Sequence, residues 1–209
     1  AHLTLTGANV SAVAAAGDVN NDNYADMLVG AWNNGSAGVA YLVFGSETPA
    51  STIDLQQVAV NHTGIEIRGL VAGDDLGYSV SSAGDFNGDG FDDLMIGARN
   101  AGGTAGAAYV IFGKAGGWAD SSGDWRIDLS TLDGANGFAI NGVAPGDRFG
   151  SSVSSAGDIN GDGFGDLIVG APGVGSTSGI GYILFGRAGD WDPNVDAGSV
   201  DGQDSFRID

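Results

Sequence analysis

Apolar side chains along this chain gather in short runs of four to seven residues. The runs are rich in Val, Ile, Tyr and Phe, and they are bounded by Gly, Asp, Asn and Ser. Runs of this length with such boundaries are typical of β-strands. We find no segment of about 10–12 residues that combines a sustained helical period with capping residues. The pattern therefore predicts an all-β fold.

The same order of runs returns three times, at spacings of 67 and 73 residues. Each unit has a small and polar run, an acidic nonapeptide, an apolar run ending in Gly-Ala, a Gly-rich turn, and an apolar run ending in Phe-Gly. The last of these reads AYLVFG at 40–45, AYVIFG at 108–113 and GYILFG at 181–186. Three to five short strands per unit predict a four-stranded antiparallel sheet repeated in space, as in β-propeller blades. We expect residues 1–209 to form one repeat domain of three blades.

Two further features follow from this repeat. The apolar runs after each acidic loop are nearly continuous, so both faces of those strands should be buried between neighbouring blades. Near the chain ends, Leu3–Gly7 aligns with 65–69 and 138–142, and we align Phe206–Asp209 with the runs STIDL at 51–55 and WRIDL at 125–129. On this alignment the chain begins inside one repeat period and stops close to the same phase three periods later.

The acidic nonapeptides occupy 18–26, 85–93 and 158–166. Positions 1, 3, 5 and 9 are Asp, Asn, Asp and Asp, and position 7 is aromatic, so it can offer only its backbone carbonyl. Oxygen donors without sulfur or imidazole suit Ca²⁺, with Mg²⁺ second. The candidate ligands are Asp18, Asn20, Asp22, Tyr24 and Asp26; Asp85, Asn87, Asp89, Phe91 and Asp93; and Asp158, Asn160, Asp162, Phe164 and Asp166. We expect about three Ca²⁺ ions, one per loop.

The residues between these ligands support the same interpretation. Gly88, Gly90, Gly161 and Gly163 permit the positive φ that folds successive oxygens around one centre. Asn21 and Asn23 replace the glycines in the first loop, so we expect the weakest binding there. The alternative is a metal-free Asp/Asn-Gly turn whose side chains cap backbone amides. Three copies in register favour the metal, because three convergent carboxylates repel one another without a cation.

The charge of the chain agrees with cation binding. Acidic residues number 26 against 7 basic ones, which gives a net charge of −19, and 24 of the acidic residues are Asp. This balance disfavours nucleic acid and anionic membranes as partners, since both are bound by basic patches. No apolar run approaches the length of a membrane span, so we expect no membrane insertion. The chain has no cysteine and therefore no disulfide framework.

The third unit resembles the FG-GAP repeats of integrin α-subunit β-propellers and their bacterial relatives. It has Phe149-Gly150 as "FG", Gly170-Ala171-Pro172 as "GAP", and the acidic loop between them. The second unit has Leu76-Gly77 and Gly97-Ala98-Arg99, and the first keeps Gly30-Ala31-Trp32 but has Asn9-Val10 in place of FG. The resemblance implies radially arranged blades, one Ca²⁺ between the first two strands of each blade, and an extracellular or cell-surface location.

Three repeats are too few to close a propeller, which normally needs about four to eight blades. Either the remaining blades of a parent chain or a homo-oligomer would then complete the ring. The resemblance also implies that the calcium loops stiffen the blades, while partners use other surfaces.

Catalytic candidates are few. His2 and His62 do not recur with the repeats, and serines such as Ser81 and Ser154 lie in small-residue strands. We therefore expect a non-catalytic, calcium-stabilised extracellular module for cell adhesion, protein interaction or assembly, with a protein or glycan ligand left open. The alternatives are an accessory carbohydrate-binding domain of a larger secreted enzyme, acting through Trp32, Trp118 or Trp191, and a structural subunit of a surface assembly.

Overall fold

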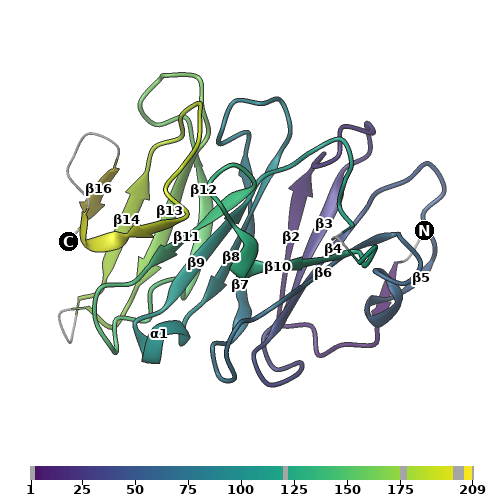
Figure 1. Ribbon diagram of the computed structural model, residues 1–209, viewed down its shortest axis with the longest axis horizontal. Coiled ribbons are helices and arrows are strands. Elements are labelled where there is room, and N and C mark those ends of the chain that lie inside the picture. Colours follow the sequence, from purple (N-terminus) through teal and green to yellow (C-terminus); the bar gives the residue numbers. More distant parts are fainter. Residues whose placement is uncertain (1–2, 120–121, 175–177, 200–204, 209) are drawn as a thin grey trace.

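The computed structural model describes residues 3–119, 122–174, 178–199 and 205–208. Nearly all of its regular structure is β, which confirms the predicted fold class. Within the described residues one short α-helix, α1 (Ala101–Thr104), and three single 3₁₀ turns accompany the strands. Figure 1 shows the sheets standing side by side along the long axis, in chain order from the N-terminus to the C-terminus. None of the described helices has the length and apolar character that crossing a bilayer requires.

Three sheets form the body, each built on four antiparallel strands, and we call these sets of four strands blades 1, 2 and 3. A fifth, parallel strand extends the sheets of blades 1 and 2. In each blade, three strands that are consecutive in the sequence pair in order. The fourth, outer strand comes later in the chain, after a connecting segment. The strands of blade 1 are β2 (Ala12–Gly17), β3 (Asp26–Ala31), β4 (Val39–Val43) and β6 (Gly64–Arg68). Those of blade 2 are β7 (Leu76–Gly84), β8 (Asp93–Ala98), β9 (Ala107–Ile111) and β11 (Gly137–Asn141). Those of blade 3 are β12 (Ser152–Gly157), β13 (Asp166–Ala171), β14 (Ile180–Leu184) and β16 (Ser205–Ile208).

A short strand in each unit reaches back to the sheet before it. β10 (Arg126–Asp128) and β15 (Asn194–Asp196) pair in parallel with β6 and β11, the outer strands of blades 1 and 2. In the same way β5 (Thr52–Asp54) pairs with β1 (Thr4–Thr6). A 3₁₀ turn follows each of these strands: η1 (Leu55–Gln57), η2 (Leu129–Thr131) and η3 (Ala197–Ser199). These backward pairings join consecutive units in addition to their packed faces.

The three returning strands correct one prediction. We aligned Phe206–Asp209 with the runs at 51–55 and 125–129, but residues 205–208 form β16, the antiparallel outer strand of blade 3. The true third counterpart of β5 and β10 is β15, whose sequence is Asn-Val-Asp. The error has a physical cause, because both kinds of strand alternate apolar and polar residues, and Ile208 is followed by Asp in the sequence as Ile53 and Ile127 are. Asp209 itself lies outside the described residues.

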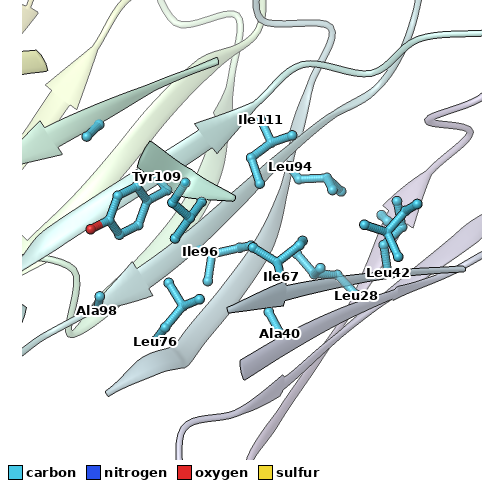
Figure 2. Packing of buried hydrophobic residues seen from close by; sticks show 14 of the residues in the cluster. Leu28, Ala40, Leu42, Ile67, Leu76, Leu94, Ile96, Ala98, Tyr109 and Ile111 are labelled. Carbon is cyan, nitrogen blue, oxygen red and sulfur yellow. The ribbon is translucent and has the colours of Figure 1, made fainter. Parts of the chain in front are cut away.

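Most of the hydrophobic core lies between the blades, and a third cluster, which includes Tyr41 and Leu55, lies on the other face of blade 1. Between blades 1 and 2, Figure 2 shows aliphatic side chains from the two sheets facing one another, among them Leu28, Leu42, Ile67, Leu94, Ile96 and Ile111. Between blades 2 and 3, Phe138 and Met95 pack with Phe149, Leu167 and Val169. Every residue of β8 and β9 is buried, as the continuous apolar runs predicted. β14, in the last described blade, is buried only in part.

Glycines allow the blades to approach closely at the FG and GAP positions. A Cβ on Gly97 would lie 2.1 Å from the carbonyl oxygen of Gly150, and a Cβ on Gly30 would lie 2.1 Å from that of Gly77. The GAP glycine of one blade therefore packs against the backbone of the FG glycine of the next. Any side chain at Gly97 or Gly30 would push the two sheets apart.

Candidate functional site

The acidic loops all connect the first strand of a blade to the second. Loop 1 (18–26) joins β2 to β3, loop 2 (85–93) joins β7 to β8, and loop 3 (158–166) joins β12 to β13. Position 9 of each loop is the first residue of the second strand, so one carboxylate per loop is fixed by the sheet. The other candidate ligands belong to the loop itself.

The backbone of the loops follows the prediction from the sequence. Positions 4 and 6 are left-handed in all three loops. The φ values are 57° and 69° at Asn21 and Asn23, 76° and 87° at Gly88 and Gly90, and 79° and 95° at Gly161 and Gly163. Glycine takes this conformation without strain, whereas asparagine merely tolerates it. The backbone of loop 1 is therefore the most strained of the three loops.

Side chains at positions 1, 3 and 5 turn back onto their own loop. In loop 1, the Asp18 carboxylate accepts from the amides of Asp22 (3.0 Å) and Asn23 (2.8 Å). Asn20 accepts from the Asp22 amide and donates to its carboxylate, each at 3.0 Å. Asp22 in turn accepts from the Tyr24 amide at 2.9 Å. The contacts between positions 3 and 5 and between positions 5 and 7 recur in loops 2 and 3.

Loop 2 differs from its neighbours at one buried oxygen. The equivalent Oδ1 atoms of Asp18 and Asp158 accept the position 5 amide at 3.0 and 3.1 Å. In loop 2 the Asp85 carboxylate accepts from Gly90 through Oδ2, and its buried Oδ1 has no hydrogen-bond partner among the described residues. A buried carboxylate oxygen without a donor is unfavourable, and a hard cation is a natural partner for it. This atom, within an all-oxygen donor set, fits a Ca²⁺ ligand.

The carboxylates at position 9 have a second role that the sequence did not indicate. Asp26, Asp93 and Asp166 are 3%, 0% and 0% exposed. In each, Oδ2 accepts the amide of loop position 2, and Oδ1 accepts the amide of the glycine in the Phe-Gly run that follows the third strand. These bonds are 2.7–3.0 Å long and tie each loop to the neighbouring strand. The Phe-Gly runs therefore supply partners for the loops.

Burial changes the acidity of two of these carboxyl groups. Desolvation raises the pKa of Asp93 from 3.8 to about 7, against the lowering effect of its two backbone hydrogen bonds. The same cause raises the pKa of Asp26 to about 6. A bound cation would favour the ionised forms of both carboxyl groups, because its attraction for the carboxylates offsets the cost of removing them from water.

The three Asp carboxylates of each loop do not converge on one point. Among the described residues, no group of three or more His, Cys, Asp or Glu side chains lies close enough to hold a metal ion. Holding a cation therefore requires the Asp side chains of a loop to move inward. The carboxylates at position 9 can keep their amide bonds while they do so, since each oxygen has a second lone pair.

The tryptophans raised as a sugar-stacking surface mostly serve packing. Trp118 and Trp191 are only 5% and 6% exposed, and a cation lies over each ring, from Lys114 and Arg187 respectively. Trp32 contacts Tyr78 of the next blade at 6.0 Å between ring centroids.

A cavity of about 770 Å³ lies beside loop 1. Trp118, Trp125 and His62 line it, together with Asn20 and Asp22 of the loop. The His62 ring stacks on Trp125 at 4.8 Å, a pair that the sequence pattern did not suggest.

Comparison with known proteins finds repeats of a known family in this chain. The family described as "FG-GAP repeat" matches residues 76–111 and 149–184. Integrin alpha-PS5 of Drosophila melanogaster is 36% identical over 105 residues, which are 50% of this chain and 10% of that protein. Phosphatidylinositol-glycan-specific phospholipase D of Bos taurus is 32% identical over 175 residues, 78% of this chain and 19% of that protein. Integrin alpha-V of Gallus gallus is 29% identical over 161 residues, 75% of this chain and 14% of that protein.

The chain thus spans between a tenth and a fifth of the length of these relatives. The matched segments run from the FG strand of blades 2 and 3 through the acidic loop to the third strand. They contain the glycine contacts and the loops described above. Together, the matched repeats, the integrin α relatives and the four-stranded sheets show that this chain carries FG-GAP repeats folded as β-propeller blades.

Proposed function

We propose that the chain is a calcium-binding, calcium-stabilised β-propeller module that is non-catalytic and serves adhesion, protein interaction or assembly outside the cell. The observation that carries the proposal is the buried Asp85 Oδ1, which lacks a donor inside an all-oxygen loop. The same donor types return at the same positions in three loops. Each loop would hold one Ca²⁺ through positions 1, 3, 5 and 9 and the carbonyl of position 7.

The role of the cation would be to hold the first two strands of a blade together. Three Asp side chains per nonapeptide repel one another in the cation-free chain, and the repulsion grows as burial lowers the local dielectric constant. A divalent ion removes this repulsion and adds bonds that exist only in the folded state. Affinities on the order of 10⁻⁴–10⁻³ M are typical of extracellular calcium modules. Such affinities would suffice where calcium is plentiful.

The placement of the catalytic candidates supports a non-catalytic role. His62 is exposed and stacked on Trp125, while Ser81 and Ser154 lie in β7 and β12 and donate to neighbouring backbone carbonyls. The relatives named integrin support adhesion and an extracellular location. The relatives named phospholipase D indicate that such repeats also occur within proteins named as enzymes, where this module would be an accessory part.

The architecture implies that additional propeller blades are the partner of this chain. A face of blade 3 carries an open hollow lined by Val153, Ile168 and Ile180, and β16 has no returning strand beside it among the described residues. We propose that further blades, from a longer parent chain or from a second copy, cover this face. Light scattering on the isolated chain tests association, because a stable monomer with no exposed apolar surface would refute it.

The proposed calcium role is tested by melting the chain with and without the ion. Chelation should lower the melting temperature, and added Ca²⁺ should restore it, because a ligand that binds only the folded state stabilises it by mass action. Mg²⁺ at the same concentration should restore less. An unchanged melting curve after thorough chelation would refute the proposal.

A second candidate function is carbohydrate binding, and the cavity beside loop 1 favours it. Its volume of about 770 Å³ is that of a small-molecule site, and it combines the rings of Trp118, Trp125 and His62 with polar loop side chains. Trp118 itself is only 5% exposed, so Trp125 and His62 are the rings that a sugar would contact. Glycan-array binding that is lost in Trp125→Ala would support this function, and an array with no binding would refute it.

A further inference from the structure

Loop 2 carries a carboxylate that bonds to loop 1 rather than to its own loop. This residue, Asp92, is at position 8 and lies between two candidate ligands of loop 2, Phe91 and Asp93. Its Oδ2 accepts from the backbone amide of Asp18 at 2.8 Å, across 74 residues of sequence. Its own amide donates to the Asp18 carbonyl at 3.4 Å. Asp92 therefore holds the backbone of the first candidate ligand of loop 1 from both sides.

The Asp92 side chain occupies the space above Gly17, the residue that precedes loop 1. A Cβ on Gly17 would lie 2.0 Å from Asp92 Oδ2 and 2.3 Å from its Cγ. The equivalent glycines, Gly84 and Gly157, would meet nothing within 4 Å. All three have positive φ, so the difference lies in the space above them and not in the backbone. Of these three glycines, only Gly17, directly before loop 1, is covered by a side chain from the next blade. Loop 2 is covered at a different position, since a Cβ on Gly88 would lie 2.3 Å from the Phe164 ring.

The junction between loops 2 and 3 provides the comparison inside the same molecule. Position 8 of loop 3 is Gly165, which has no side chain to reach backward. Its amide donates to the Asp85 carbonyl at 3.1 Å, the counterpart of the bond from Asp92 to Asp18. The backbone contact is therefore common to both junctions, and the carboxylate contact occurs only between loops 1 and 2.

We infer that Asp92 is a positioning residue that couples the cation site of loop 1 to that of loop 2. The inference rests on the proposed function, namely that the loops bind Ca²⁺. Asp93 is already held by the strand that it begins, and a cation in loop 2 would also fix the carbonyl of Phe91, so that the residue between them is held on both sides. Fixed in this way, Asp92 holds Asp18 in place for the second cation. Occupancy of loop 2 therefore raises the affinity of loop 1.

Loop 1 is also the loop that needs such support. Asn21 and Asn23 hold its left-handed positions, where loops 2 and 3 have glycine. Partners that orient a metal ligand from outside typically change affinity by about 10- to 100-fold when removed. We therefore expect Asp92→Ala to weaken cation binding at loop 1 by about tenfold or more, with loop 3 unchanged.

Loop 1 can be observed by itself, because its position 7 is Tyr24 whereas loops 2 and 3 have Phe. Tb³⁺, a hard cation that emits when a neighbouring tyrosine transfers energy to it, is the probe. The part of the emission that Tyr24→Phe abolishes reports binding at loop 1. Titrating the 209-residue chain with Tb³⁺ then gives the affinity of this loop in each variant.

Three variants, Asp92→Ala, Asp92→Asn and Asp190→Ala, distinguish the loss of a positioning contact from the loss of a negative charge and from misfolding. Asp92→Asn keeps an oxygen that can accept the Asp18 amide, so it should retain most of the loop 1 affinity that Asp92→Ala loses. Asp190→Ala removes one exposed negative charge far along the sequence and should leave loop 1 unchanged. Circular dichroism shows whether each variant is folded.

Coupling itself is tested by disabling the other loops. Asp89→Ala in loop 2 should weaken Tb³⁺ binding at loop 1, while Asp162→Ala in loop 3 should not. In the Asp92→Ala background, Asp89→Ala should have no further effect on loop 1. If Tb³⁺ binds normally at loop 1 in Asp92→Ala, the coupling is refuted and the proposed function stands. If no loop of the unaltered chain binds Tb³⁺ or Ca²⁺, the proposed function fails as well.

Discussion

The close contact between Gly97 and Gly150 predicts that a methyl group added at this junction destabilises the chain. In Gly97→Ala the new Cβ would lie 2.1 Å from the Gly150 carbonyl oxygen and 2.2 Å from the Ser79 hydroxyl. Gly97 does not have positive φ, so the substitution tests space alone. Inserting a methyl group against backbone typically destabilises a packed core by about 1–3 kcal/mol. Alanine also reduces the conformational freedom of the unfolded chain, which offsets about 0.4–1 kcal/mol of this destabilisation.

The matched control is Gly170→Ala, the same position in blade 3. Its Cβ would meet the Ser152 hydroxyl at 2.3 Å, but the next atoms are 3.7 Å away or more, and that hydroxyl can rotate. For a chain of this size each kcal/mol shifts the melting temperature by about 2–4 °C. We expect Gly97→Ala to melt several degrees lower and Gly170→Ala to stay within about 2 °C of the unaltered chain. Equal melting temperatures for the two variants, measured by circular dichroism, would refute the close-approach explanation.

Two further predictions concern buried groups. In the cation-free chain, the free energy of unfolding should fall as pH rises from about 4 to about 7. Burial raises the pKa of Asp93 to about 7 and that of Asp26 to about 6, so in this range the folded state holds protons that the unfolded state releases. Urea titrations at several pH values measure this, and a slope that Asp93→Asn leaves unchanged would contradict it. Trp191→Ala should destabilise the chain more than Trp118→Ala, by about 0.5–1.5 kcal/mol, because Trp191 pairs with Phe138 at 4.7 Å and with Phe86 at 4.9 Å, whereas Trp118 pairs with Phe44 at 5.8 Å. Equal unfolding free energies for the two variants would argue against a contribution from these ring pairs.

Much of the fold could be predicted because the blade strands are long enough to show a pattern. The runs that form β8 and β9 are apolar throughout, and both strands are buried on both faces. The returning strands could not be identified in the same way. β5, β10 and β15 have three residues each, too few to indicate a parallel partner in another sheet. For that reason residues 205–208 were assigned to the wrong class of strand.

The loops show the same division between local and distant contacts. Positive φ at Asn21 and Gly88 follows from residue type alone, so the sequence predicted it. The bond from the Gly113 amide to Asp93 spans 20 residues, and that from Asp18 to Asp92 spans 74. Such contacts depend on how strands and blades are stacked. A pattern within nine residues therefore located the candidate site but did not reveal what supports it.

Counting the bound ions tests whether these loops hold calcium. Equilibrium dialysis of the chain against about 1 mM Ca²⁺, near the affinity range of extracellular calcium modules, gives the number of ions per chain. We expect a titration that saturates at three ions per chain and at two in Asp162→Ala, which removes a candidate ligand from loop 3. A chain that binds no Ca²⁺ in this range, or an Asp162→Ala variant that still binds three ions, would show that these loops are not the calcium sites.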